Sequence, residues 1–594
     1  MRVRDALDRF LDKFELPVYA ALFLAALVLR LSALEGGPLS PKEAAEAWGA
    51  MDLLRGGAAA SSSALYASFT AGLLFLSGAS HGAPRLFPAA AGALAVLLPL
   101  LFRNTRGRIE SLLLAVLLAL SPSLWIASTM AGGTALGFLA AGFFIFYARS
   151  KQSHPLVSGL ALGLAAAAGP AGWSGLAIAA AVPLVERFLH SGNTPAETAG
   201  AGGRPPIIRA DPRFARADSR PPLPMPAAIA GFLIGILGGA TGLFIFPRGI
   251  GALAAGIGGW LGAFLSGWPR IGEFILLFIG YEPMAIVFGT VGLILLSRGL
   301  FSAEDRFWTT FAAVATIWVL IRPAAFPDEA VWVILPLLVL GARALRLTLE
   351  SPVLEERPIF ALVQAGAILT LAAFAVLNLA AYVSSGSLLN IVLALVGILG
   401  GLFPGLLYSE DLRRAVRASL AGLALAWFSI LFVTQAGAGW NATHSRRTSA
   451  NELWQTETAA ADVLRLHSTL VQISGWQTGV KDELSVVIQL PEESALGWEL
   501  LTYKAAGYPV MVDMLSTPPM LISPYVELEG AVAAPQLTVV YRGQAFGYTE
   551  RRAWFGWPPD LIRWLLFRDG PVERERVILW VRSDILVPEE GAKE

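Results

Sequence analysis

The sequence contains no cysteine and only five histidines among 594 residues. Without cysteine the chain can form neither a disulfide nor a thiolate metal site, and it has no cysteine nucleophile. The histidines are scattered and lack the spacing of a metal site; they are His81, His154, His190, His444 and His467. These absences argue against thiol chemistry and against a zinc site built from histidine.

Charged residues are scarce as well. They make up 15% of the chain, whereas hydrophobic residues make up 55%, and soluble globular proteins usually carry about 25% charged residues. Apolar runs long enough to cross a bilayer recur along the chain, and most are apolar on every face. The formal net charge of zero provides no basic field for nucleic acid. The composition therefore indicates a membrane protein that spans the bilayer many times and binds no nucleic acid.

The apolar runs predict a polytopic all-α membrane domain over residues 1–435, with about 13 transmembrane helices. The expected spans are 16–34, 85–102, 109–127, 131–149, 156–170, 172–189, 227–246, 283–298, 306–321, 329–347, 359–383, 388–408 and 416–435. Lysine and arginine concentrate in every second loop, which places the N-terminus in the cytoplasm. Span 227–246 carries Gly231, Gly235 and Gly239 at four-residue spacing, which predicts close approach of a neighbouring helix.

Two further segments are expected outside the spans. Residues 190–226 are rich in proline, glycine and arginine without apolar periodicity, and predict a disordered cytoplasmic linker. Residues 436–594 alternate β-rich runs (484–490, 509–514, 537–541 and 577–581) with helical stretches (450–470, 493–506 and 559–567). This alternation predicts an extracytoplasmic α/β domain.

The first outside loop, 35–84, is charged although it follows a membrane span, and the second, 247–282, is also long. Each contains an apolar helix, at 64–76 and 250–268, that we expect to lie in the interface or to be re-entrant. A charged loop against the membrane surface is either a lid over a site or a packing element. The function predicted from the sequence depends on this choice.

Glu43 and Glu46 lie one turn apart on a helix expected to start after Ser40, with Pro41 at its first position. Ser40 and Glu43 have the spacing of a capping box, so capping is one interpretation of Glu43. The other is that Glu43 or Glu46 acts as a general base or cation ligand facing a cavity at membrane level.

Positive residues near the same level are candidates for binding a lipid phosphate. Lys42 is either a solvated lysine or a point charge for phosphate, and Arg85 either extends its charge toward the interface or binds phosphate. Arg322 is the strongest candidate for gripping a phosphate, the alternative being an ion pair with Asp328. Further outside carboxylates lie in the second loop, at Glu273 and Glu282.

Several short motifs resemble those of the GT-C-type membrane glycosyltransferases, the group that includes family 39 enzymes, protein O-mannosyltransferases and aminoarabinose transferases. In the membrane domain they are Leu29-Arg30-Leu31, Pro38 to Ala44, Leu65-Tyr66, Pro84 to Pro88, Leu118 to Pro122, Arg322-Pro323 and Leu335-Pro336. In the tail, Gly497-Trp498, Tyr548 to Trp557 and Trp564 to Asp569 also resemble archaeal flippase-activity-associated relatives.

The resemblance implies transfer of a sugar from a polyprenyl-phosphate donor to an extracytoplasmic acceptor, a lipid-linked glycan or a protein, with inversion, in the plasma (inner) membrane. It implies a carboxylate base, with Tyr66 as an additional site residue and a divalent cation as a possible cofactor. Lys42 stands where the group has its loop aspartate, and residues 128–133 lack the second acid. The alternative is a non-catalytic relative that binds lipid-linked sugars or partners and assists glycan export or assembly. A secondary transporter is less favoured, because no internal repeat is evident.

Overall fold

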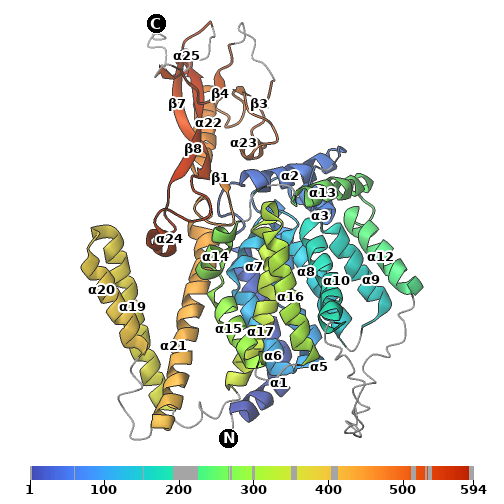
Figure 1. Cartoon of the computed structure of the whole chain (residues 1–594). Coiled ribbons are helices and arrows are strands. Elements are labelled where there is room, and N and C mark those ends of the chain that lie inside the picture. Colours follow the sequence, from blue (N-terminus) through green and yellow to red (C-terminus); the bar gives the residue numbers. More distant parts are fainter. Residues whose placement is uncertain are drawn as a thin grey trace.

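The computed structural model describes residues 3–58, 60–150, 153–191, 225–264, 267, 270–297, 302–349, 358–402, 412–509, 517–528, 531–532 and 538–586. A helical bundle forms one part of the molecule, and a β-sheet domain stands at one end of it (Figure 1). The predicted fold class, an all-α membrane domain followed by an α/β domain, is confirmed. Nearly all of the predicted linker, 190–226, lies outside the described residues.

The helices of the first half alternate between long spans and short pieces. They are α1 (Val3–Leu31), α2 (Pro41–Leu54), α3 (Ala64–Ser77), α4 (Ala83–Ala95), η1 (Leu98–Phe102), α5 (Arg103–Arg106), α6 (Arg108–Leu120), α7 (Pro122–Thr129), α8 (Thr134–Arg149), α9 (Pro155–Ala167) and α10 (Pro170–Ser191). Two of the short helices, α2 and α3, lie within the loop predicted at 35–84.

The second half of the bundle runs to residue 445. Its helices are α12 (Met225–Ala240), η2 (Pro247–Gly249), α13 (Ile250–Gly262), α14 (Ile271–Gly280), α15 (Pro283–Ser297), α16 (Ala303–Leu320), η3 (Pro323–Ala325), η4 (Asp328–Ala330), α17 (Val331–Leu349), α19 (Pro358–Ser385), α20 (Leu388–Leu402), α21 (Leu412–Trp440) and η5 (Asn441–Ser445). Helices α19 and α20 form a hairpin that stands beside α21 (Figure 1).

Within the described residues, four helical segments are long and apolar enough to cross a membrane, or up to six if two bent pairs each count as one span. The first bent pair, α6 and α7, turns by 54° at Pro122, so the predicted span 109–127 is not one straight helix. Proline lacks the N–H that would continue the helical hydrogen bonds. The second pair, α14 and α15, turns by 94° before Pro283. The predicted number of spans stays a prediction.

Helices α9 and α12 pack with almost no side chain between their backbones. A Cβ atom on Gly231 would lie 2.2 Å from the carbonyl oxygen of Leu156, and one on Gly235 would lie 2.4 Å from that of Leu160. The close approach predicted from the glycine spacing is therefore confirmed, and it has the geometry expected of small residues at a helix interface.

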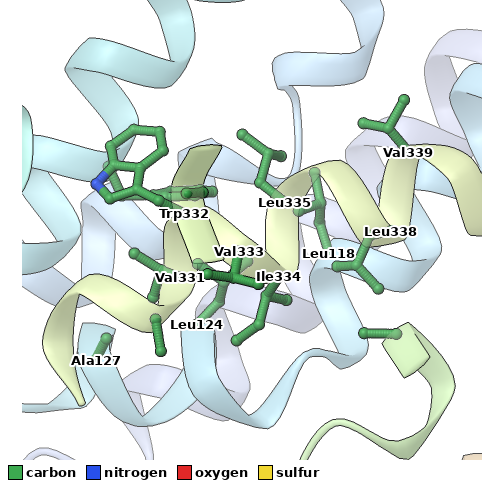
Figure 2. Packing of buried hydrophobic residues seen from close by; sticks show 14 of the residues in the cluster. Leu118, Leu124, Ala127, Val331, Trp332, Val333, Ile334, Leu335, Leu338 and Val339 are labelled. Carbon is green, nitrogen blue, oxygen red and sulfur yellow. The ribbon is translucent and has the colours of Figure 1, made fainter. Parts of the chain in front are cut away.

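The largest apolar core lies around α17. Trp332 and Leu335 of α17 pack near Leu118 of α6 and Leu124 of α7 (Figure 2), and all four side chains are buried. A helix buried on several faces among other helices is what a run with few polar residues predicts. This core holds the start of α17, and with it the preceding η3–η4 turn, in a fixed position.

The sheet domain contains a six-stranded sheet in the order β1-β7-β8-β4-β2-β3. The strands are β1 (Glu457–Ala459), β2 (Val486–Ile488), β3 (Ala506–Gly507), β4 (Met520–Pro524), β7 (Tyr541–Arg552) and β8 (Val572–Arg582), with a separate pair β5 (Glu527–Leu528) and β6 (Ala531–Val532). β2 runs parallel to β3 and β4, and the other pairs in this sheet are antiparallel.

Three helices accompany the sheet, α22 (Asp462–Thr478), α23 (Ala495–Glu499) and α24 (Leu561–Phe567), followed by the short α25 (Ser583–Leu586). The helix predicted at 450–470 is wrong in its first half, which contains β1. The physical reason is pairing across the chain, because β1 pairs antiparallel with β7 and forms one edge of the sheet. The strand predicted at 509–514 falls almost wholly outside the described residues.

Candidate functional site

A cavity of about 520 Å³ lies at the end of the bundle that faces the sheet domain. Short helices of both outside loops and the η3–η4 turn surround it, together with the starts of α8 and α10. Its polar lining residues are Lys42, Glu46, Ser62, Thr134, Trp260, Arg322, Asp328 and Glu329. The structure thus brings four of the sequence-predicted residues, Lys42, Glu46, Arg322 and Asp328, to one hollow.

Helix α2 presents Lys42 and Glu46 to this cavity, because residues four apart share one face of a helix. The carboxylate of Glu46 is held from the following loop. It accepts hydrogen bonds from the hydroxyls of Ser61 and Ser62 and from the Ser62 backbone N–H at 3.2 Å. These neutral donors fix the position of the carboxylate and leave its charge without an ion-pair partner among the residues described.

Arg322 is completely buried at the far side of the cavity. Its guanidinium contacts the Glu329 carboxylate and donates to Ser174 Oγ at 2.7 Å and to the Trp260 carbonyl at 2.8 Å. The predicted alternative for Arg322, an ion pair with Asp328, is therefore corrected to one with Glu329. Asp328 and Glu329 are neighbours in the 3-10 turn η4, so their side chains leave the turn in different directions, and Asp328 contacts Lys42 instead.

Aromatic rings enclose the same guanidinium. Its central carbon lies 4.9 Å from the ring centre of Trp260, 4.7 Å from Phe264 and 5.4 Å from Trp318. Such contacts stabilise a cation electrostatically. Nη1 and Nη2 of Arg322 are engaged by protein groups, and its buried Nε has no hydrogen-bond partner among the described residues. The burial and these contacts make Arg322 a structural support of the cavity wall.

Lys42 makes an ion pair with Asp328 that joins α2 to η4. Desolvation would lower the pKa of Lys42, but the Asp328 carboxylate raises it above its ordinary value, so the ammonium stays charged. The Lys42 side chain remains 58% exposed. Asp328 engages one face of the ammonium, and the exposed side chain can offer its other N–H groups to a ligand.

Glu43 points away from the cavity into the protein, where its side chain is 1% exposed. Its two oxygens accept from Nε and Nη2 of Arg85 at 2.8 and 2.9 Å, and Arg447 approaches at 3.3 Å. Burial alone would raise the pKa of Glu43, but the charges of Arg85 and Arg447 hold it well below its usual value. The predicted capping box with Ser40 is also present.

Arg85 is fully engaged by its surroundings. Besides Glu43, it donates to the carbonyls of Leu34, Gly37 and Pro38 at 2.9 to 3.1 Å. These bonds account for all five N–H groups of a guanidinium. The pair of Arg85 and Glu43 therefore joins the start of α2 to the start of α4, and the carbonyl contacts hold the segment between α1 and α2. Glu43 also accepts from the Ala131 backbone N–H at 3.1 Å, and Ala131 lines the cavity.

The remaining predicted residues lie outside the cavity lining. Tyr66 is buried and donates to the Pro84 carbonyl at 3.0 Å. Glu273 pairs with Arg552 of the sheet domain at 2.9 Å. Glu282 accepts from Ser121 Oγ at 2.6 Å, which ties the bend between α14 and α15 to the bend between α6 and α7.

Several contributors were not singled out from the sequence. The serine run at 61–63 is visible in the sequence and follows α2 closely, so it offered a signal for Glu46. Arg447 offered none, because it lies 404 residues from Glu43. Ser174 and Trp260 reach Arg322 from other helices and likewise give no local signal.

A divalent cation does not fit this donor set. Asp328 is paired with Lys42, and Glu329 is paired with Arg322. Glu46 is the lining carboxylate that has no ion pair among the described residues, whereas a Mg²⁺ or Ca²⁺ site built from protein groups alone takes about six to eight oxygen ligands. Across the described part of the chain, no three His, Asp or Glu side chains form a group suited to a metal ion.

No protein-family model and no curated protein matches the sequence. Among solved structures, ArnT from Cupriavidus metallidurans bound to undecaprenyl phosphate is similar, with 15% identity, 96% of this chain and 99% of that chain covered, and a TM-score of 0.49. The Archaeoglobus fulgidus oligosaccharyltransferase tethered to an acceptor peptide follows at 11% identity, with 87% and 70% covered and a TM-score of 0.43. Both are GT-C glycosyltransferases, the group that the sequence resembles. At such identities, the activity has to be argued from this chain's own residues.

Proposed function

We propose that this protein transfers a sugar from a polyprenyl-phosphate-linked donor to an acceptor, a lipid-linked glycan or a protein, on the extracytoplasmic side of the plasma membrane. One observation carries the proposal: the same cavity holds Glu46, a carboxylate in no direct ion pair among the described residues, and an exposed ammonium, Lys42. A base and a phosphate-binding cation are the two groups that such a transfer needs.

In this proposal Glu46 accepts the proton of the acceptor group as the acceptor attacks the anomeric carbon of the donor. The bond between that carbon and the phosphate oxygen breaks, and the polyprenyl phosphate leaves with both electrons of the bond. Lys42 stabilises the charge that develops on the phosphate. Attack from the face opposite the leaving phosphate inverts the anomeric configuration, and the reaction consumes no nucleotide sugar.

The serines and Arg322 have positioning roles in this scheme. Ser61 and Ser62 orient the Glu46 carboxylate by hydrogen bonds. Arg322 and Glu329 hold the η3–η4 turn that carries Asp328. Glu43 and Arg85 anchor α2, the helix that supplies both Lys42 and Glu46. This assigns Glu43 and Arg85 to support and leaves the proton transfer to Glu46.

The orientation in the membrane is also part of the proposal. Residues 1–435 form the membrane domain with the N-terminus in the cytoplasm, and residues 436–594 form the extracytoplasmic domain. The charge asymmetry of the loops supports this orientation. Helices α2 and α13, which contribute residues to the cavity lining, lie at the end of the bundle where the sheet domain stands (Figure 1), so an acceptor outside the membrane would approach from the sheet side.

A glycan assay on membranes from cells expressing Glu46→Gln tests the proposal. The matched control is Glu492→Gln, which alters an exposed glutamate paired with Arg55. We expect product to fall about 100-fold or more for Glu46→Gln at normal protein level, and to stay at the wild-type level for the control. Unchanged product with Glu46→Gln would exclude the proposed transfer reaction with Glu46 as its base.

The second candidate is a non-catalytic protein that binds lipid-linked sugars and assists glycan export or assembly. The pairing of Asp328 and Glu329 with cations favours it, since it leaves Glu46 as the one available carboxylate of the cavity lining described. This candidate predicts binding of a polyprenyl phosphate sugar without transfer, and normal binding by Glu46→Gln.

A further inference from the structure

We propose that the Lys42 ammonium supplies, as a fixed charge, the positive charge that a divalent cation would otherwise bring to this cavity, and that phosphate binding here is independent of metal. The inference rests on the proposed function for the identity of the phosphate group. It goes beyond that function in stating that the Lys42 ammonium holds the phosphate and that no divalent cation is needed.

The first step is the state of the cavity's carboxylates. A divalent cation beside a substrate phosphate is usually held by one or two carboxylates that are free to turn toward it, and a carboxylate that binds the cation no longer serves as a base. The Asp328 carboxylate is engaged by the Lys42 ammonium, and the Glu329 carboxylate by the Arg322 guanidinium. Binding a metal through either carboxylate would separate an existing ion pair and bring two positive charges together. The lining residues therefore offer such a cation one unpaired carboxylate, Glu46.

The second step is the placement of Lys42. It lies four residues before Glu46 on α2, and both line the cavity. Its neighbour on η4, Asp328, keeps the ammonium charged and holds it at the cavity wall. An ammonium is a compact point charge that suits a phosphate whose orientation is set by other groups.

The third step is the contrast between Lys42 and Arg322, the other cation in the lining. The Lys42 side chain is 58% exposed and reaches the space of the cavity, whereas Arg322 is completely buried. Arg322 contacts Glu329, Ser174 and the Trp260 carbonyl. A phosphate that enters the cavity can therefore reach the exposed N–H groups of Lys42 while Asp328 keeps its ion pair, but Arg322 would have to leave a buried network.

Binding of undecaprenyl phosphate to the purified full-length protein in nanodiscs is the primary test. We expect the same dissociation constant with EDTA as with Mn²⁺. We expect Lys42→Met to bind at least about tenfold more weakly than the wild type, which is the scale of one lost charge-assisted hydrogen bond. Lys42→Arg restores part of the affinity. Lys504→Met, which alters another exposed lysine–aspartate pair at 3.1 Å, binds as the wild type does. Loss of binding in EDTA, or full binding by Lys42→Met, overturns the inference.

The second measurement is Mn²⁺ binding followed by electron paramagnetic resonance, on the wild-type protein and on Glu46→Gln. We expect the wild-type protein to have no stoichiometric Mn²⁺ site that depends on Glu46. A stoichiometric Mn²⁺ site that is lost in Glu46→Gln overturns the inference. Sugar transfer that requires added Mn²⁺ defeats this inference but leaves the proposed function standing. Metal-independent phosphate binding without any sugar transfer supports this inference but defeats the proposed function.

Discussion

The ammonium of Lys42 contacts the carboxylate of Asp328, and this ion pair connects α2 of the first outside loop to the η4 turn before α17. Both residues line the cavity that also holds Glu46. The two residues are 286 positions apart in the chain, so the ion pair joins two distant segments of the cavity wall. Its partial exposure leaves the Lys42 ammonium accessible to a ligand in the cavity.

Asp328→Asn should release Lys42 for a ligand. Because the pair is partly exposed, we expect the free energy of unfolding to change by about 1 kcal/mol or less. We also expect undecaprenyl phosphate to bind more tightly, since a competing negative charge is removed. Calorimetric titration and thermal denaturation of the same preparation measure both. Weaker binding by Asp328→Asn would show that Asp328 itself helps to hold the ligand.

Glu43→Gln should destabilise the protein strongly. It leaves Arg85 and Arg447 buried beside a neutral amide, and removing one partner of a buried ion pair costs about 3–5 kcal/mol. Thermal unfolding in detergent, followed by intrinsic fluorescence, measures the loss. Glu492→Gln, in an exposed pair with Arg55, is the control and should change stability by about 1 kcal/mol or less. Equal melting temperatures for the two variants would contradict the anchoring role of Glu43.

Glu499 should make the contact between the first outside loop and the sheet domain sensitive to acid. Nε2 of His81 and Nδ1 of His467 each lie 3.0 Å from one of its oxygens. Burial alone would raise the pKa of Glu499, but the hydrogen bond with His467 and the nearby His81 lower it to about 2 from its ordinary value of 4.5.

A carboxylate with a lowered pKa in the folded state stabilises the protein fully above its unfolded pKa, and this contribution is lost as the pH falls toward the folded pKa. The difference in melting temperature between wild type and Glu499→Gln should therefore be largest above about pH 4.5 and shrink between pH 4.5 and 2. Melting curves at several pH values give this difference. A difference that grows as the pH falls would contradict the assignment.

Gly231→Ala should force α9 and α12 apart. The added Cβ would lie 2.2 Å from the Leu156 carbonyl oxygen, a backbone atom that cannot move away alone. Overpacking of this kind costs about 1–3 kcal/mol. Gly258→Ala on α13 is the matched control, because its Cβ would meet no atom within 4 Å. Chemical denaturation of both variants tests the prediction, and equal midpoints would argue against tight packing of α9 on α12.

Local patterns in the sequence predicted those features that depend on neighbours along the chain. The Ser40–Glu43 capping box and the glycine spacing of α12 are both present. The short helices α3 and α13 also appear close to the predicted ranges. Each of these features is decided by residues within a few turns, which is why spacing alone identifies them.

The rest depends on contacts between distant segments. Glu43 and Glu46 look alike in the sequence, but Arg447 and Arg85 draw Glu43 into the protein while Ser61 and Ser62 hold Glu46 at the cavity. Arg322 pairs with Glu329 and not with Asp328, because two 3-10 turns set the direction of each side chain. Such choices follow from tertiary packing, which no periodicity in a single sequence records.

The most direct measurement is a structure of the purified protein with undecaprenyl phosphate. The account predicts the phosphate in the cavity between α2, α13 and η4, within hydrogen-bonding distance of Lys42 Nζ and with Glu46 facing the space where the sugar would lie. A phosphate bound elsewhere on the protein, with this cavity unchanged, would contradict it.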